Sequence, residues 1–132
     1  MIKKLNLSIN LKRPDVIIFD TDNTLYEYEL ANKMAEDAVE RVLNSRFKIN
    51  SDLFRSTYQK SKKEIKAQLG KTASSHSRLL YFQRFLEILG FKAKLKIALE
   101  LEEIFWNTFL DNAFLFPGIK ELLGEIRNKK IA

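Results

Sequence analysis

The stretch that decides the predicted fold is Val16-Ile17-Ile18-Phe19-Asp20-Thr21-Asp22-Asn23-Thr24-Leu25. It opens with four consecutive apolar residues, which follow Pro14 and precede a polar cluster. A short apolar run with these flanks is typical of a β-strand buried on both faces, and such strands belong to parallel sheets covered by helices. We therefore predict an α/β protein, with residues 16–19 as the first strand of a Rossmann-like parallel core.

Helical periodicity follows this strand, between about residues 28 and 109. Apolar residues recur every three or four positions in four segments, two of which end at glycines suited to a helix C-terminus, Gly70 and Gly90. Ser51 stands where the second segment would have its N-cap. The four segments could pack as a bundle. In the first of them we expect a buried stripe of Leu30, Met34, Ala38 and Val42.

The residues after this bundle predict a return to the α/β core. Pro117 suits the first position of a further helix, and Ile131-Ala132 would begin a second strand. We thus expect a core strand and motif in residues 1–27, a helical bundle in residues 28–112 and a return to the core in residues 113–132. The core would be incomplete in this chain, because a stable sheet needs about three strands or more.

Two carboxylates, Asp20 and Asp22, directly follow the predicted strand. Residues two apart on an extended backbone face the same way, and open α/β sheets bind ligands at the carboxyl ends of their strands. Because neighbouring carboxylates repel each other, the pair needs a cation or a shared proton, and Mg²⁺ is a natural compensation. Near a metal-polarised phosphorus, Asp20 could act as a nucleophile and Asp22 as a general acid and base.

Two alternatives remain open, one for the motif and one for the chain. Residues 20–23 could form a turn after a strand, in which the Asp and Asn side chains satisfy backbone amides. The chain could also be a small basic binding module for nucleic acid, or for a protein chain whose sheet it completes, since its formal net charge is +6. The basic residues are interleaved with acidic ones, which favours a solvated surface over nucleic-acid binding. We also interpret one basic helix face as solvated and not as a nucleic-acid contact. It consists of Lys60, Lys62, Lys63 and Lys66.

Residues 16–25 resemble the first motif of the haloacid dehalogenase superfamily, an apolar strand followed by Asp-x-Asp-x-Thr. The resemblance implies that Asp20 is phosphorylated and binds Mg²⁺, that Asp22 is the general acid/base and binds Mg²⁺ through its backbone carbonyl, and that Thr24 supports the motif loop. The second aspartate is typical of the phosphatases of this superfamily. The implied function is Mg²⁺-dependent hydrolysis of a small phosphorylated metabolite through an aspartyl-phosphate intermediate.

The helical segment is similar to the α-helical cap that some members of this superfamily insert after the first motif. Residues 28–112 would be that cap. His76 and Arg78 could contact the substrate from it, although an exposed imidazole at a polar helix start is the reading we favour for His76.

The resemblance stops after the predicted cap. Members of the superfamily need three further motifs: a Ser or Thr that ends the second strand, a Lys that holds the phosphate, and an acidic pair that completes the Mg²⁺ site. No Ser or Thr follows Thr108 and no Asp follows Asp111. Lys129 and Lys130 precede the expected second strand, so they cannot fill the third-motif position. We therefore expect a truncated chain with little or no activity alone.

Composition excludes several other classes of protein. With 45% hydrophobic and 30% charged residues and only 4 Gly and 2 Pro, the chain is neither disordered nor fibrous. It contains no Cys, which excludes disulfides and thiolate metal sites and fits a reducing compartment. No apolar run reaches the roughly 18 residues of a membrane span. We expect a cytoplasmic protein that has no membrane partner.

Overall fold

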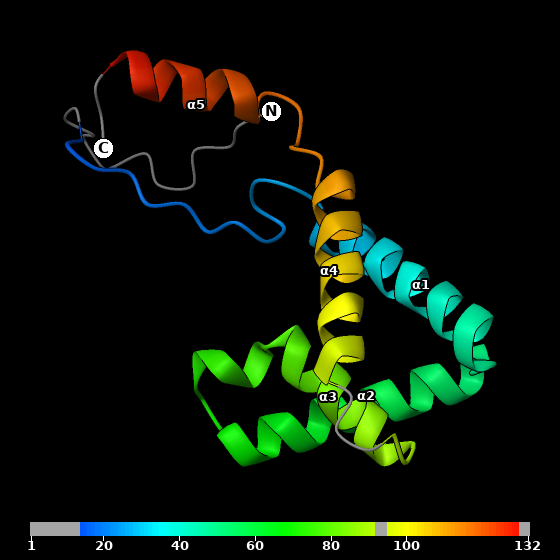
Figure 1. The fold of residues 1–132 in the computed structure, drawn as a ribbon. Helices are drawn as coiled ribbons and strands as arrows, with labels where there is room; N and C mark the ends of the chain where they lie inside the picture. The colour runs from blue at the N-terminus through cyan, green and yellow to red at the C-terminus, as the bar shows by residue number, and fades with distance from the viewer. Residues whose placement is uncertain (1–13, 92–94, 130–132) are drawn as a thin grey trace. The chain divides into compact units, whose positions relative to one another are not determined.

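A computed structural model of the chain describes residues 14–91 and 95–129 (Figure 1). Within these residues it has five α-helices and one short 3₁₀ helix. They are α1 (Tyr28–Phe47), α2 (Ser51–Leu69), η1 (Ala73–His76), α3 (Arg78–Ile88), α4 (Leu95–Asn112) and α5 (Ile119–Asn128). In the ranges just given, no helix combines the length and the apolar character that a bilayer span requires.

The chain divides into two compact units. One, the motif unit, comprises Met1–Glu27 and Phe114–Ala132, and the other, the helical unit, comprises Tyr28–Ala113. The candidate catalytic motif lies in the first unit, and α1 to α4 lie in the second.

The predicted α/β fold with a Rossmann-like core is wrong, because the part of the chain that the structure describes is helical and has no β-strand. Residues 16–19 form no strand, and Val16 and Ile18 are 58% and 91% exposed instead of buried. A strand is stabilised by pairing with neighbouring strands. Apolar β-formers without such a neighbour remain an extended segment. The expected second strand at residues 131–132 lies outside the described residues.

In the motif unit, a turn at residues 21–26 contacts the segment that precedes α5. Tyr26 forms an isolated antiparallel bridge with Leu115, and the Phe116 amide donates a hydrogen bond to the Leu25 carbonyl at 2.9 Å. Single bridges of this kind tie two segments together without making a sheet.

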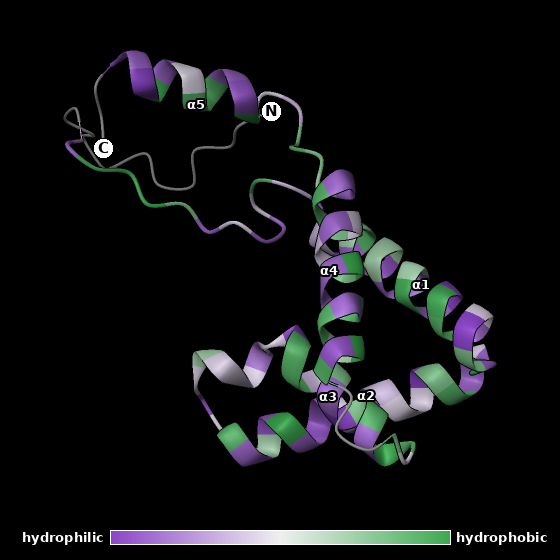
Figure 2. Cartoon of the chain, in the orientation of Figure 1, coloured by the Kyte–Doolittle hydropathy of each residue, from purple (hydrophilic) through white to green (hydrophobic). Residues whose placement is uncertain are grey.

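The last helix, α5, begins later than its sequence suggests. Its N-cap is Gly118, with φ at 87°, so Pro117 lies before the helix and not at its first position. No residue of α5 is buried, although hydrophobic residues recur along it (Figure 2).

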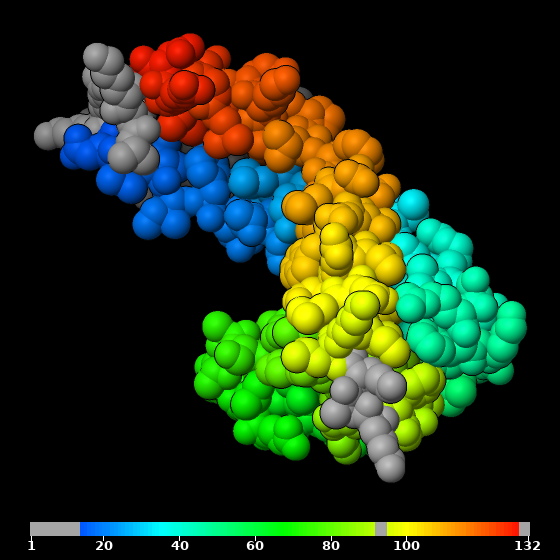
Figure 3. Space-filling view, in the orientation of Figure 1, coloured from blue at the N-terminus to red at the C-terminus, as the bar shows by residue number. Residues whose placement is uncertain are grey.

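The helical unit has a core of its own. Its helix α1 packs mainly against α4, α2 against α3, and α3 against α4; the contact between α1 and α4 is visible in Figure 3. Every buried hydrophobic residue in the described ranges belongs to this unit. Its large aromatic members are Phe54, Tyr58, Tyr81, Phe82, Phe85, Phe105 and Phe109.

The buried face of α1 differs in part from the predicted stripe. Ala38 is buried as predicted and Val42 is half-buried, but Leu30 and Met34 are exposed. The buried residues of α1 are Ala31, Ala35, Ala38, Val39 and Leu43. Alanine side chains are small, so a face of this kind lets two helix backbones approach closely. The predicted stripe relied on large apolar residues and missed this packing mode.

The start of α2 also differs by one residue. Asn50, not Ser51, is the N-cap, and its side-chain Oδ1 accepts a hydrogen bond from the Leu53 amide at 2.9 Å. The Ser51 hydroxyl instead donates to the Glu40 carboxylate on α1. An Asn at this position is an equally strong cap.

Candidate functional site

The motif carboxylates lie on the turn at residues 21–26. The amides of Thr24 and Leu25 both donate to the Thr21 carbonyl, at 3.2 and 2.9 Å. Asn23, in the middle of this turn, has φ at 57°. This left-handed region is one that Asn tolerates better than most residues, so the local sequence suits the turn.

Hydroxyl groups from the same turn bind both carboxylates. The Thr24 hydroxyl donates to Asp20 Oδ2 at 2.8 Å, and the Tyr26 hydroxyl donates to Asp22 Oδ1 at 2.5 Å. In each pair the residues are four apart in sequence, so the turn itself brings the donor to its acceptor. Hydroxyl donors are not what an amide-satisfying Asx turn predicts. Tyr26 was not among the predicted site residues.

The two carboxylates fit part of a Mg²⁺ site. Asp20 and Asp22 are both exposed, and Mg²⁺ prefers hard oxygen donors, usually one or two carboxylates completed by water and substrate phosphate. Within the described ranges, no group of three or more His, Cys, Asp or Glu residues could hold a metal ion. The catalytic and metal-binding roles of these aspartates stay predictions.

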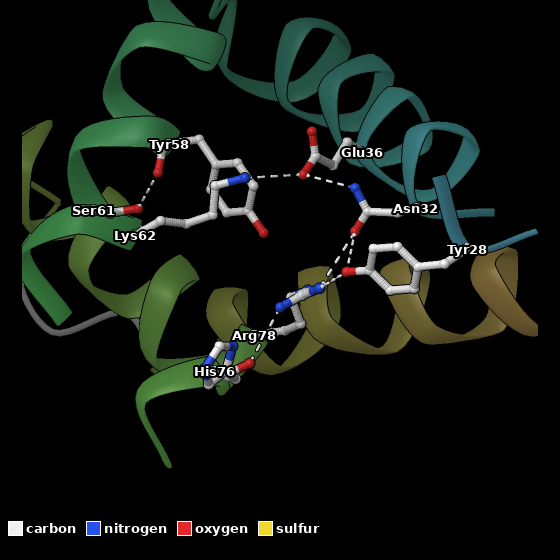
Figure 4. Close-up of polar contacts among 8 residues, drawn as sticks. All are labelled: Tyr28, Asn32, Glu36, Tyr58, Ser61, Lys62, His76 and Arg78. Atoms are coloured by element: carbon white, nitrogen blue, oxygen red, sulfur yellow. Dashed lines mark hydrogen bonds and ion pairs between the residues drawn. The ribbon is translucent and has the colours of Figure 1, made fainter. Parts of the chain in front are cut away.

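A second polar cluster lies in the helical unit and is centred on Arg78, at the start of α3 (Figure 4). The half-buried Arg78 donates from Nη2 to the Tyr28 hydroxyl at 2.7 Å and to Asn32 Oδ1 at 3.3 Å. Its Nη1 donates to the backbone carbonyl of His76 at 3.2 Å. These acceptors are all neutral, so the contacts position the guanidinium without cancelling its charge.

Aromatic rings surround the same guanidinium. Its Cζ lies 4.9 Å from the Phe105 ring centroid, 5.6 Å from that of Tyr81 and 5.8 Å from that of Trp106. A cation is attracted to the face of an aromatic ring, and such contacts limit the motion of the side chain. No carboxylate of the described residues forms an ion pair with Arg78, and its Nε is buried without a hydrogen-bond partner.

Lys62 and Tyr58, both on α2, extend the cluster. Lys62 Nζ lies 3.2 Å from Glu36 Oε1 and 4.7 Å from the centroid of the Tyr58 ring. The Tyr58 hydroxyl is buried and has no hydrogen-bond partner. Burial is the main reason that the pKa of Tyr58 is raised above its usual value, with a smaller opposing effect of Arg78. The hydroxyl is therefore neutral at physiological pH.

The cluster borders a pocket of about 340 Å³ formed by α1, α2, η1 and α3. No acidic residue lines it. The lining residues are Tyr28, Asn32, Gln59, Lys62, Lys63, Lys66, His76, Arg78 and Tyr81. Such a pocket has the charge and the hydrogen-bond donors needed to hold an anion.

Both residues predicted to contact substrate, His76 and Arg78, line this pocket, and His76 is exposed. Their proposed contact with substrate stays a prediction. Sequence reasoning missed Tyr28 and Asn32, which lie 50 and 46 positions from Arg78 along the chain. No local pattern in the sequence connects them, because it is the packing of both α1 and α3 against α4 that brings them together.

Comparison with known proteins shows that the chain is similar to ribulose-1,5-bisphosphate 5-phosphatase from Halopiger xanaduensis. The two sequences are 34% identical over 116 residues, which are 87% of this chain and 48% of the relative. No family model matches the chain, and no solved structure matches it. The chain spans about half the length of the curated relative that it matches.

Proposed function

We propose that these residues contribute the first catalytic motif of a phosphohydrolase that acts on a small phosphorylated metabolite. The observation that carries the proposal is the motif turn, where Asp20 and Asp22 are exposed and each accepts a hydrogen bond from a hydroxyl group. The 34% identity to a protein named as a phosphatase supports it. The resemblance of residues 16–25 to the haloacid dehalogenase superfamily supplies the assignment of roles.

In the proposed reaction, Asp20 attacks the phosphorus atom of a phosphate ester, and the bond between phosphorus and the ester oxygen breaks. Asp22 donates a proton to the departing oxygen, and it later removes a proton from the water that hydrolyses the aspartyl phosphate. The Thr24 hydroxyl on Oδ2 of Asp20 would hold the carboxylate in one orientation, so that Oδ1 makes the attack. The Tyr26 hydroxyl would orient Asp22 in the same way.

Mg²⁺ is proposed as the cofactor. When bound, it would offset the repulsion between the carboxylates and the substrate phosphate. The Asp20 side chain and the backbone carbonyl of Asp22 would help to hold it, as the superfamily resemblance implies. Water and substrate phosphate oxygens would supply further ligands.

Sugar phosphates are the substrate class that we propose to test first. The relative is named for the removal of one phosphate from a sugar bisphosphate. The match covers 48% of that relative, so the relative's substrate is only a starting point for tests on this chain.

A chimaera tests the proposal. The 132-residue chain replaces the segment that it matches in the Halopiger xanaduensis phosphatase, and phosphate release from ribulose-1,5-bisphosphate and p-nitrophenyl phosphate is measured with and without Mg²⁺. We expect Mg²⁺-dependent turnover that Asp20→Asn abolishes. The 132-residue chain alone should be slower by about 100-fold or more, because it lacks the later motifs of the superfamily.

Asp15→Asn is the matched control, because Asp15 is an exposed aspartate outside the motif. It should leave turnover within about twofold of the unsubstituted chimaera, as surface substitutions usually do. A chimaera that is folded by circular dichroism but inactive would contradict the proposal. So would equal activities of the Asp20→Asn and Asp15→Asn chimaeras.

A further inference from the structure

We infer that the pocket between α1, α2, η1 and α3 binds the phosphate group of a small phosphorylated molecule. All of its lining residues belong to the helical unit. The inference therefore does not depend on the catalytic roles proposed for Asp20 and Asp22.

Unpaired positive charge is the first argument. Four residues that are cationic at neutral pH line the pocket: Lys62, Lys63, Lys66 and Arg78. Only Lys62 has an ion-pair partner in the described part of the chain, the Glu36 carboxylate at 3.2 Å. The remaining charge attracts an anion, and a dianionic phosphate gains most from it.

Some basic residues elsewhere in the helical unit are neutralised by carboxylates of the chain. Arg46, Arg55 and Arg84 each lie within ion-pair distance of one or more carboxylates. Other basic residues of this unit form no ion pair within the described residues either: Lys33, Arg41, Lys48, Lys71 and Lys96. The pocket differs from these positions because it gathers several cations around one cavity that no carboxylate lines. An external anion is the partner that would neutralise the pocket.

Preorganised donors are the second argument. Arg78 is held by the Tyr28 hydroxyl, by Asn32 and by the surrounding rings. Its Nη2 already donates twice and its Nε is buried, so the second N–H of Nη1 is the donor left for a phosphate oxygen. A guanidinium that is already positioned loses little freedom on binding.

The Tyr58 hydroxyl lies near the pocket, but Tyr58 is not among the residues that line it. Tyr58 is 1% exposed, and its hydroxyl has no hydrogen-bond partner. In Figure 4 this hydroxyl points from beneath Lys62 toward the space beside Asn32 and Arg78. A buried donor without a partner is costly, so this hydroxyl is a cost to the stability of the free chain and is not counted as part of the inferred phosphate site.

The shape of the site favours a small ligand over a nucleic acid. At about 340 Å³ the pocket is near the lower end of the range for small-molecule sites, roughly 300–1,000 Å³. Proteins that bind single strands present aromatic rings on which bases stack. Here Tyr81 and Phe105 are buried in the core and Arg78 occupies their faces.

Titration of the 132-residue chain with inorganic phosphate and with ribose 5-phosphate tests the inference, by calorimetry and by amide chemical shifts. We expect saturable binding to one site, with the largest shifts in the first turns of α1 and α3 and in the lysine-bearing part of α2. Lys66→Gln should weaken the Kd severalfold, and Arg78→Gln about tenfold or more. Because Lys66 is exposed, its substitution tests the site even if Arg78→Gln disturbs folding.

Lys96→Gln is the charge-matched control, because Lys96 is an exposed lysine on α4 outside the pocket lining. It should change the Kd by less than about twofold, as a screened surface charge does. Equal weakening by Lys96→Gln and Lys66→Gln would overturn the inference, because net charge alone would then explain binding. Tight binding of a mixed-sequence oligonucleotide that displaces phosphate would overturn it as well.

Asp20→Asn separates this inference from the proposed function. We expect it to leave phosphate binding unchanged, which would support the pocket whether or not the chimaera is active. Phosphate binding that Asp20→Asn changes in either direction by more than about twofold, and that Lys66→Gln leaves unaffected, would place the anion at the motif turn. That result would overturn the pocket as the binding site and leave the proposed function standing.

Discussion

In the helical unit, Phe54, Phe82 and Phe85 are at most 1% exposed, whereas in the motif unit Ile18 and Phe114 are 91% and 70% exposed. Burial of apolar surface stabilises a fold by about 25 cal/mol per Å². The helical unit therefore has the means to fold on its own core, and the described part of the motif unit does not. The candidate catalytic carboxylates thus lie on a turn supported mainly by local hydrogen bonds, while the candidate anion pocket is built on packed helices.

The largest expected effect comes from replacing one phenylalanine in each unit. Phe85→Ala removes a fully buried ring that packs edge-on against Phe54, with 5.6 Å between ring centroids. It should lower the free energy of unfolding by about 3–5 kcal/mol. Phe114→Ala, in the motif unit, should change it by less than about 0.5 kcal/mol. Urea denaturation followed by far-ultraviolet circular dichroism measures both.

Similar losses from the two substitutions would break the comparison. They would show that the motif unit contributes a core that its described residues do not reveal. A loss confined to Phe85→Ala would confirm that the helices carry the stability of the chain.

Removal of the buried Tyr58 hydroxyl sharpens the contrast from within the helical unit. Since this hydroxyl has no partner, Tyr58→Phe should stabilise the free chain by about 1 kcal/mol. The same substitution should change the Kd for phosphate by less than about twofold, because Tyr58 does not line the inferred pocket. A Tyr58→Phe variant that is less stable than the unsubstituted chain would contradict a buried hydroxyl without a partner.

The same variant predicts a change in alkaline stability. Burial raises the pKa of Tyr58 above the unfolded value of about 10. The folded state therefore holds this proton more tightly than the unfolded state. The contribution of Tyr58 protonation to the free energy of unfolding is fully present below about pH 10 and is lost as the pH rises above it. Tyr58→Phe should lose less stability than the unsubstituted chain between neutral pH and about pH 11 in urea titrations. Parallel losses in the two proteins would contradict a buried, neutral hydroxyl.

The smallest expected effect concerns Glu40, which joins α1 to α2. The Ser51 hydroxyl hydrogen bond, aided by Arg55, lowers the pKa of Glu40. A lowered folded pKa gives stability that is present above the unfolded value, about 4.3, and is lost as the pH falls through the folded pKa. Glu40→Gln should therefore cost less than about 1 kcal/mol at pH 7 and reduce the loss of stability on acidification.

Glu103→Gln serves as its control, because Glu103 is an exposed glutamate on α4. It should leave both the neutral stability and the acid slope close to those of the unsubstituted chain. Equal effects of the two substitutions would show that the contacts of Glu40 make no specific contribution to the stability of the helical unit.

The helices were predictable because their signals are local. Gly70 and Gly90 end α2 and α3 with positive φ angles, and the apolar spacing marked the helical segments between them. The strand at residues 16–19 failed because strand formation depends on a partner elsewhere in the chain, which four apolar residues cannot supply. The difference in the buried face of α1 has a related cause, since Ala31 and Ala35 are buried through the packing of helix on helix.

The candidate site residues were likewise predictable where their contacts are local in sequence, and their partners were missed where these lie far apart in sequence. Asp20, Asp22 and Thr24 were identifiable because their contacts span only a few residues. Arg78 was identified without its partners, since Tyr28, Phe105 and Trp106 lie far from it in sequence. Lys62, Lys63 and Lys66 were interpreted as a solvated helix face, and it was the packing of α2 near α1 and α3 that made them line a pocket.

One indole gives the helical unit an optical signal of its own. Trp106 is the single tryptophan of the sequence; its ring packs edge-on against Phe105 and Phe109, and the Arg78 guanidinium lies 5.8 Å from its centroid. Selectively excited tryptophan emission therefore originates in this unit alone and next to the cation that faces the pocket. Fluorescence can follow anion uptake and the opening of the helices without any label, while the motif unit contributes no signal.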